Sequence, residues 1–319
     1  MKTYSAHGKL LLSGEYAVLD GALALALPSK FGQTMQVNPP RVASSELWWN
    51  SLDADGSVWM HVRLDLDEMR IIEATDGPLA DRLLSIFKVL FRFKPSLRDL
   101  LFTETTSLPT AAPYWVIRTE LSFHRQWGLG TSSTLISLIA QWCDISPYVL
   151  LDQTFGGSGY DVACAQAEGP IFYERLPDQF PVFRPAPFHP VFADQLYFTY
   201  LGQKQDSRSA IRAWRSQMQD PGLIEAISSI SMAMTEVQQL QAFVGLMEEH
   251  ETLLSRHLHI PALKEQRFEG CPFAIKSLGA WGGDFILIAA DNPFLEIKDY
   301  FELHGCGPTL KYKEMALGL

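Results

Sequence analysis

The stretch FGGSGYDVACAQAEGPIFYE, residues 155–174, is the one from which we interpret the rest of the chain. Three glycines in its first five residues remove the Cβ barrier to positive φ, so successive backbone N–H groups can turn toward one point and form an anion nest. Asp161 follows at once on the edge of a run of small residues, and Ser158 lies among the glycines. This pattern favours a phosphate site. It leaves open a glycine-rich connector in which Asp161 only caps a buried helix.

The composition is that of a globular protein large enough for two lobes or for one large α/β unit. The chain has 319 residues, of which 47% are hydrophobic and 19% charged, so it can bury a substantial interior. Its net charge of −10 argues against a general nucleic-acid or anionic-membrane surface, because such surfaces need a basic stripe. A small anionic substrate is compatible with this charge, since binding it needs only local cations.

The cysteines and the N-terminal residues indicate in which cellular compartment we expect the protein. No CxxC pair occurs, and no histidine stands at zinc-ligand spacing, so we predict reduced and mostly buried thiols. Lys9 and Glu15 interrupt a short apolar run, which fits neither a signal peptide nor a membrane span. We therefore expect a cytoplasmic enzyme that binds neither nucleic acid nor membrane. Monomer and homodimer both stay open.

The segment GKLLLSGEYAVLDG, residues 8–21, reads as a strand, a glycine turn and the approach to a second strand. Lys9, Glu15 and Tyr16 are polar residues among apolar ones, where burial is costly unless each has a partner. A lysine held at a strand end is a suitable counter-charge for phosphate. The alternative is a surface hairpin with a solvated lysine.

A second glycine loop, GLGTSS at residues 128–133, leads into an apolar helix. The free N–H groups and positive end of a helix N-terminus make an anion site, and the hydroxyls can bind phosphate oxygens or Mg²⁺. Two familiar phosphate loops are excluded, because GxGxxG would need glycine at Ser133 and GxxxxGK[ST] occurs nowhere. Hydroxyl caps on buried helices are common, so this loop alone is a weak signal.

Hydrophobic periodicity predicts helices together with a mixed sheet. Asp76 precedes apolar residues at helical spacing and should begin a helix, residues 91–112 should form a loop, and residues 221–258 should be helical. Prolines between residues 177 and 190 predict a boundary, which gives lobes of residues 1–176 and 177–319.

Four blocks stand in a fixed order: GKLLLSGEYAVLDG, GLGTSS, GSGYDVACA and KSLGAWGGD. This order resembles the GHMP small-molecule kinases, and the resemblance spans nearly the whole chain. It implies two α+β lobes with mixed or antiparallel sheets and the active site between the lobes. Within the family, GSGYDVA, GAWGGD and LGQKQDSRSAI (residues 201–211) are similar to the phosphomevalonate kinase branch.

The resemblance implies an ATP-dependent phosphotransferase of isoprenoid precursor synthesis that uses Mg²⁺ and converts phosphomevalonate to diphosphomevalonate. Lys9 would supply charge at the transferred group, and Asp161 would orient the acceptor or pair with Lys9. Asp161 would be the general base if the acceptor were an alcohol. The implied ATP site is Gly128, Leu129, Gly130, Thr131, Ser132 and Ser133. The implied substrate site is Lys9, Ser158, Gly159, Tyr160, Lys204, Arg208, Gly279, Ala280, Gly282 and Gly283, with Arg125 and Lys276 in reserve. The implied Mg²⁺ ligands are Ser133 and, as a weaker candidate, Asp152.

The chain departs from the family pattern at three positions. His7 stands where a proline is usual, Thr131 replaces the first serine of the phosphate loop, and Trp281 interrupts the last glycine run. Two alternatives therefore stay open: a mevalonate or other GHMP kinase that phosphorylates an alcohol, and a non-catalytic nucleotide-binding protein. A serine hydrolase built on Ser158 is excluded, because GxSxG would need glycine at Tyr160.

Overall fold

The computed structural model describes the chain apart from residues 177–178, 203–210, 213, 218–219, 280–282 and 319. It divides into two compact units that are discontinuous in sequence. Unit 1 comprises residues 1–8, 31–125 and 130–166, and unit 2 comprises residues 9–30, 126–129 and 167–319. The lobes expected from a single boundary after residue 176 remain a prediction. The long strands β1 (Lys2–Ser13) and β2 (Ala24–Asn38) contribute residues to both units.

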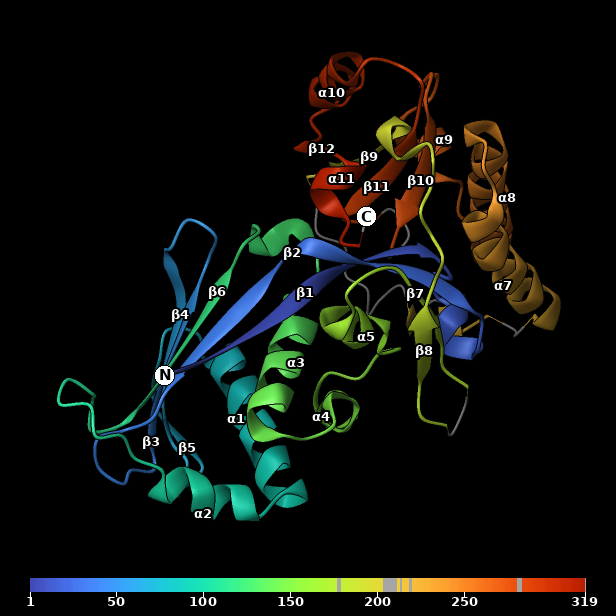
Figure 1. Cartoon of the computed structure of the whole chain (residues 1–319). Coiled ribbons are helices and arrows are strands. Elements are labelled where there is room, and N and C mark those ends of the chain that lie inside the picture. The colour runs from blue at the N-terminus through green and yellow to red at the C-terminus, as the bar shows by residue number, and fades with distance from the viewer. Residues whose placement is uncertain (177–178, 203–210, 213, 218–219, 280–282, 319) are drawn as a thin grey trace. The chain divides into compact units, whose positions relative to one another are not determined.

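Unit 1 is built on a mixed sheet with the strand order β5-β4-β3-β6-β2 (Figure 1). Strands β3 and β6 are parallel and the other neighbours are antiparallel. Buried residues alternate with partly exposed ones along β3, β4 and β6, so one face of the sheet carries the buried side chains. Those side chains form one core with residues of α1, α3, α4 and α5. The elements are β3 (Glu46–Leu52), β4 (Val58–Asp65), β5 (Arg70–Ala74), α1 (Gly77–Phe93), α2 (Ser96–Thr103), β6 (Trp115–Leu121), α3 (Thr131–Cys143), α4 (Pro147–Thr154) and α5 (Tyr160–Gln166).

The helix predicted after Asp76 is confirmed. The Asp76 carboxylate accepts a hydrogen bond from the Leu79 N–H at 3.0 Å, which satisfies one of the amides left open at a helix start. The prediction of a loop through residues 91–112 is wrong in part, because α2 occupies Ser96–Thr103. Its buried residues Leu97 and Leu101 join the core, and that burial outweighs the polar composition of the segment.

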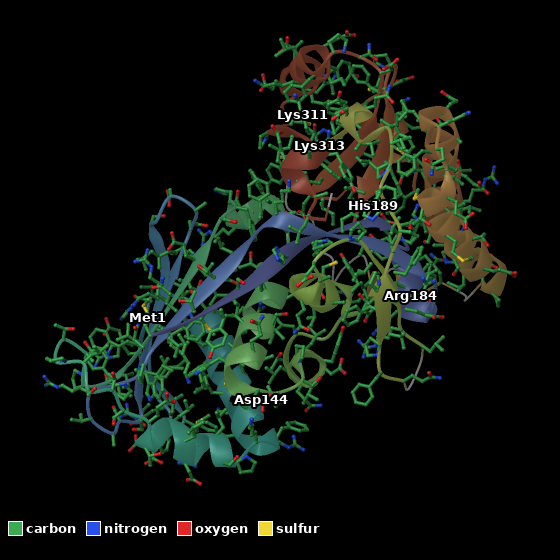
Figure 2. All side chains as sticks on the ribbon, in the orientation of Figure 1. Met1, Asp144, Arg184, His189, Lys311 and Lys313 are labelled. Atoms are coloured by element: carbon green, nitrogen blue, oxygen red, sulfur yellow. The ribbon has the colours of Figure 1, made fainter. Side chains whose placement is uncertain are left out.

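Unit 2 contains an antiparallel sheet with the order β10-β11-β9-β12. The inner strands β9 and β11 are buried at every residue, as expected for strands covered on both faces. By contrast β8 is exposed along its length, and its Arg184 lies over the Phe172 ring at 4.6 Å (Figure 2). The elements are η1 (Ala17–Asp20), β7 (Ile171–Glu174), β8 (Val182–Pro185), η3 (Ala193–Gln195), β9 (Leu196–Tyr200), α7 (Pro221–Glu236), α8 (Leu240–Leu258), α9 (Leu263–Arg267), β10 (Ala274–Leu278), β11 (Phe285–Ala289), α10 (Phe294–Leu303), β12 (Thr309–Lys311) and α11 (Tyr312–Met315).

The helical stretch predicted at residues 221–258 is two packed helices, α7 and α8 (Figure 1). Both hold the turn between β1 and β2. The Ser13 and Ser231 hydroxyls lie 2.7 Å apart, and the Leu23 N–H donates to Ser228 Oγ at 3.0 Å. Beneath these contacts the turn packs on apolar residues of α7 and α8. The glycine turn of the first sequence block is therefore fixed to this helical pair.

Two further predictions concern the whole chain. All four cysteines are free and buried, as predicted. Within the described ranges, none of the helices combines the length and the hydropathy that a bilayer crossing requires.

Candidate functional site

Three of the four sequence blocks meet at one cavity inside unit 2. Lys9 of β1, Gly128 and Leu129 of the second loop, and Gly279 and Asp284 around the last glycine loop line it together. The Lys9 N–H donates to the Leu129 carbonyl at 3.0 Å, so strand β1 and the second loop are joined through the backbone. Segments far apart in sequence thus form one small cavity, in which Lys9 and Asp284 are the charged side chains of a mostly apolar lining.

Two glycines of this cavity are required by space and by backbone conformation. Gly128 has φ 68°, and a Cβ there would lie 1.7 Å from Asp284 Oδ2. Gly279 has φ 79°, and its Cβ would lie 3.9 Å from Lys9 Nζ. Any other residue at Gly128 would displace the Asp284 carboxylate, whereas Gly279 is required mainly for its left-handed conformation.

The loop GLGTSS passes from unit 2 to unit 1 at residue 130 and opens α3. Gly130 is the N-cap with φ 94°, and no side chain caps the helix. The Ser133 hydroxyl is buried and donates to the Gly130 carbonyl at 2.8 Å, so its lone pairs remain for another partner. Thr134 donates to Gln33 Oε1 at 2.7 Å and fixes the first turn to β2. The helix therefore begins with amides that no side chain of the loop occupies.

The anion nest predicted at residues 155–161 has the expected backbone. Gly156, Gly157 and Gly159 have φ values of 66°, 109° and 88°. No atom lies within 4 Å of a Cβ built at Gly156 or Gly157, so conformation alone requires glycine there. Asp161 lies in the first turn of α5, where Oδ1 accepts from the Val162 N–H at 2.9 Å. This contact is with the next residue, whereas the N-cap of the alternative interpretation would accept from an amide two or three residues further on.

The other predicted site residues are distributed as follows. Ser158 and Tyr160 are half-buried beside the nest in unit 1, and Gly283 is buried in unit 2. Asp152 lies exposed on α4. Among the residues described, no three acidic, histidine or cysteine side chains come together as a protein-only metal site would need. Lys204, Arg208, Ala280, Trp281 and Gly282 lie outside the described residues.

The two reserve cations have structural partners. Arg125 lies 3.4 Å from Asp53 Oδ2 and stacks over the Trp59 ring at 5.3 Å. Lys276 is fully buried, and Nζ donates to Glu15 Oε1 at 2.7 Å. The assignment of Lys276 to an acceptor anion is therefore wrong, because its ammonium is enclosed and already neutralised.

Lys276 belongs to a cluster of buried ionisable residues in unit 2. Its Nζ also donates to the Ser277 carbonyl at 3.0 Å and lies 3.7 Å from Glu251 Oε1. His250 Nε2 lies 3.0 Å from Glu15 Oε2 and 3.2 Å from the Gly14 N–H. One nitrogen cannot donate to the carboxylate and accept from the amide at once, so the position of one proton decides which contact forms. We call Glu15, His250, Glu251 and Lys276 the buried cluster.

Burial and neighbouring charges give the two carboxyl groups of the buried cluster very different pKa values. Burial alone would raise the pKa of Glu15, but the Lys276 ammonium and the hydrogen bonds from His250 and Lys276 outweigh it and lower the pKa to about 2. Burial raises the pKa of Glu251 to about 7, because Lys276 offsets this only in part and the Glu15 charge adds to it. Burial also lowers the pKa of His250. Near neutral pH the cluster is thus an ion pair with a neutral imidazole and a glutamate close to its midpoint.

Sequence reasoning missed several residues of unit 2. Trp127 and Asp284 line the cavity, and Trp127 packs edge-on against Phe285 at 5.8 Å. An acid directly after a glycine loop was a usable signal for Asp284. His250 and Glu251 carried no such signal, because their helix reads as an ordinary amphipathic one.

The fold is that of the GHMP kinases, and this confirms the resemblance at the level of the fold. Among solved structures, Streptococcus pneumoniae phosphomevalonate kinase in complex with phosphomevalonate and AMPPNP is 16% identical, with 97% of this chain and 99% of that chain covered and a TM-score of 0.69. L. major mevalonate kinase in complex with R-mevalonate is 16% identical, with 98% and 96% covered and a TM-score of 0.64. Lactococcus lactis galactokinase complexed with galactose is 11% identical, with 99% and 93% covered and a TM-score of 0.61.

These neighbours are complexes with phosphomevalonate, R-mevalonate and galactose respectively, so the shared fold does not select a substrate. No protein-family model and no curated protein matches the sequence.

Proposed function

We propose that this chain is an ATP-dependent small-molecule kinase. The observation that carries the proposal is the unit 2 cavity, where Lys9, the start of the GLGTSS loop and the loop before Asp284 converge. A flexible lysine beside glycine backbone is the chemistry that a phosphate group needs. The GHMP kinase fold supports the same activity.

We assign the nucleotide phosphates to Gly128–Ser133 and the amides at the start of α3. Gly130 in the left-handed region and the absence of a side-chain cap on this helix fit that role. Ser133 directs its proton to the Gly130 carbonyl, so its oxygen suits a hard cation, and the exposed Asp152 is the second candidate ligand. Mg²⁺ bound there would neutralise charge on the phosphates.

The remaining assignments concern the acceptor. Ser158, Gly159, Tyr160 and Asp161 are proposed to bind it, and Gly279, Ala280, Gly282 and Gly283 are further candidates. Lys204 and Arg208 are proposed to bind its anionic group. Lys9 would hold its ammonium at the transferred phosphoryl group, where negative charge has to be neutralised.

We propose phosphomevalonate as the acceptor, in a cytoplasmic mevalonate pathway. The phosphomevalonate-kinase-like blocks GSGYDVA and LGQKQDSRSAI support this choice. A phosphomonoester is already ionised near neutral pH, so transfer to it needs charge neutralisation and alignment more than a base. The second candidate is an alcohol acceptor such as mevalonate, for which Asp161 in the first turn of α5 would be the base.

The test is ATP-dependent ADP release with Mg²⁺ against a panel of phosphomevalonate, mevalonate, sugars and amino-alcohols. Turnover with phosphomevalonate alone supports the proposal, and turnover only with an alcohol moves Asp161 to the base. ATP binding without turnover on the whole panel contradicts the kinase proposal. In an active enzyme, Lys9→Met should lower kcat by about a thousandfold while circular dichroism stays unchanged. A fully active Lys9→Met protein would disprove the role of Lys9.

A further inference from the structure

The turn between β1 and β2 is strained and is held from several sides. Tyr16 has φ 56° and ψ −46°, a conformation that a residue with a Cβ adopts only when its surroundings impose it. Its ring stacks on Trp214 at 5.7 Å, and Trp214 Nε1 donates to Asp20 Oδ2 at 2.7 Å. Just before it, a Cβ at Gly14 would lie 2.6 Å from the Ala24 Cβ. Strain of this kind persists where a fixed geometry is needed.

Residues of the buried cluster lie in this turn and on β10, the strand that leads to Gly279 of the cavity. Glu15 lies in the turn, and Lys276 lies on β10, three residues before Gly279. Their contact at 2.7 Å therefore links the continuation of the Lys9 strand to the strand that ends at the Gly279 loop. His250 and Glu251 add contacts from α8 to both partners.

Stability alone does not account for these charges. The free energy lost when two charges are removed from water is about as large as the free energy gained from their attraction. Replacing a buried ion pair by a well-packed apolar pair often leaves the protein as stable or more stable. A charged hydrogen bond differs from an apolar contact because it fixes a distance and a direction. The buried cluster is therefore better suited to setting a register than to adding stability.

We propose that the buried cluster is a positioning device for the cavity: Glu15 and Lys276 hold β1 and the end of β10 in register, so that Lys9 Nζ and the Gly279 loop face the same phosphate. The proposal rests on the proposed kinase function for the identity of that phosphate. It assigns Glu15, His250, Glu251 and Lys276 as positioning residues that act through Lys9 and Gly279.

The test uses the double variant Glu15→Gln/Lys276→Met, which removes both charges of the ion pair together, while Glu251, whose pKa burial raises to about 7, can take up a proton. We expect a folded protein whose kcat falls at least about tenfold while the KM for ATP stays within about twofold, because alignment is lost and the nucleotide loop is not. The matched control is Glu46→Gln/Arg63→Met, a partly exposed pair of unit 1 at 2.8 Å, which should change neither constant.

A second readout does not depend on turnover. The rate of Lys9 acetylation by acetic anhydride is followed by peptide mass spectrometry, with Lys2, whose side chain is 63% exposed, as the internal reference. The double variant should change the Lys9 rate by about threefold or more relative to Lys2, because the ammonium is no longer held at its place. The control pair should leave it unchanged.

The outcomes separate the two proposals. Wild-type protein without turnover on any acceptor contradicts the kinase function, and Lys9 labelling then still decides on positioning. A folded double variant with unchanged kcat and unchanged Lys9 labelling overturns the positioning role. If the double variant does not fold, Glu15→Gln alone replaces it, because Glu251 then remains 3.7 Å from Lys276 as a partner. Its kcat and its rate of Lys9 acetylation then decide whether the buried cluster positions Lys9.

Discussion

Glu15 and Glu46 make nearly the same contact in very different surroundings. Glu15 Oε1 lies 2.7 Å from Lys276 Nζ, and Glu46 Oε1 lies 2.8 Å from Arg63 Nη2. The Glu15 side chain is 2% exposed, whereas that of Glu46 is 32% exposed. Distance is therefore a poor guide to what an ion pair does, because the surroundings decide whether water can replace the lost partner.

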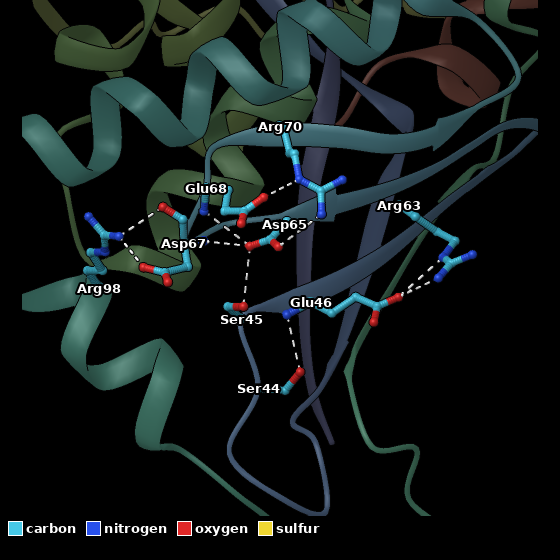
Figure 3. A network of polar contacts seen from close by, with 9 residues as sticks. All are labelled: Ser44, Ser45, Glu46, Arg63, Asp65, Asp67, Glu68, Arg70 and Arg98. Carbon is cyan, nitrogen blue, oxygen red and sulfur yellow. Dashed lines mark hydrogen bonds and ion pairs between the residues drawn. The ribbon is translucent and has the colours of Figure 1, made fainter.

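The exposed pair belongs to a network along β3, β4 and β5 (Figure 3). Arg63 bridges Glu46 and Glu73, Arg70 contacts Glu68 and Asp65, and Arg98 contacts Asp67. Each charge there keeps access to water, so removing one partner leaves the other solvated. In the buried cluster, the charge that remains after its partner is removed is not solvated by water.

The largest effect is expected for Lys276→Met. It leaves the Glu15 carboxylate buried without its cation, and such a loss costs about 3–5 kcal/mol of unfolding free energy. Urea unfolding followed by circular dichroism measures it. The double variant Glu15→Gln/Lys276→Met is the control, because it should recover most of the loss. If Lys276→Met is as stable as the double variant, water must reach the Glu15 carboxylate. Glu15 and Glu46 would then not differ in their access to water.

The pH dependence of stability isolates Glu251. Its pKa rises from 4.5 to about 7 on folding, so the folded protein binds more protons than the unfolded chain between these values, and stability falls as pH rises through this window. The Glu251→Gln variant lacks the titrating carboxyl and therefore this pH dependence of stability. The stability of the variant relative to wild type should therefore rise by about 3 kcal/mol between pH 4.5 and pH 8, with each pH measured by urea unfolding.

His250 does not confound that comparison. Its lowered pKa makes stability rise with pH below its usual value of 6.5, but it contributes in both proteins. Glu15 makes stability fall as pH drops from about 4.5 toward about 2, at and below the lower edge of the window, and it does so in both proteins. A constant difference between Glu251→Gln and wild type would mean that Glu251 titrates in the folded protein as it does in the unfolded chain.

Glu15→Gln should cost less than Lys276→Met, although it breaks the same ion pair. The Glu251 carboxyl lies 3.7 Å from Lys276, and the Glu15 charge is one cause of its raised pKa. Without that charge Glu251 ionises more readily and can neutralise the ammonium. We expect a loss of about 1–3 kcal/mol in urea unfolding at pH 7. A loss equal to that of Lys276→Met would show that Glu251 does not take over.

The contrast between the two pairs also explains what the sequence could predict. Glycines requiring positive φ, the Asp76 cap and the strand pattern depend on neighbouring residues, and the structure confirms them. Glu15 could be identified as a residue that needs a partner, because it stands in an apolar run. Its partner Lys276 could not be identified, since it is 261 residues away and lies on a strand with no polar pattern of its own. The sequence consequently leaves Lys276 as a reserve candidate for binding the acceptor anion.

The smallest effect is expected for Glu46→Gln, the same chemical change as Glu15→Gln at an exposed position. The amide keeps an acceptor for Trp48 Nε1, which donates to Glu46 Oε1 at 2.6 Å, so the variant removes charge and little else. Arg63 keeps Glu73 at 3.2 Å and its place over the Trp48 ring at 4.6 Å. We expect the melting temperature to fall by no more than about 2 °C at low salt and not at all at about 0.5 M salt, where screening removes the attraction. A larger or salt-independent loss would mean that the exposed network is held as rigidly as the buried cluster, and burial would then not be what distinguishes Glu15 from Glu46.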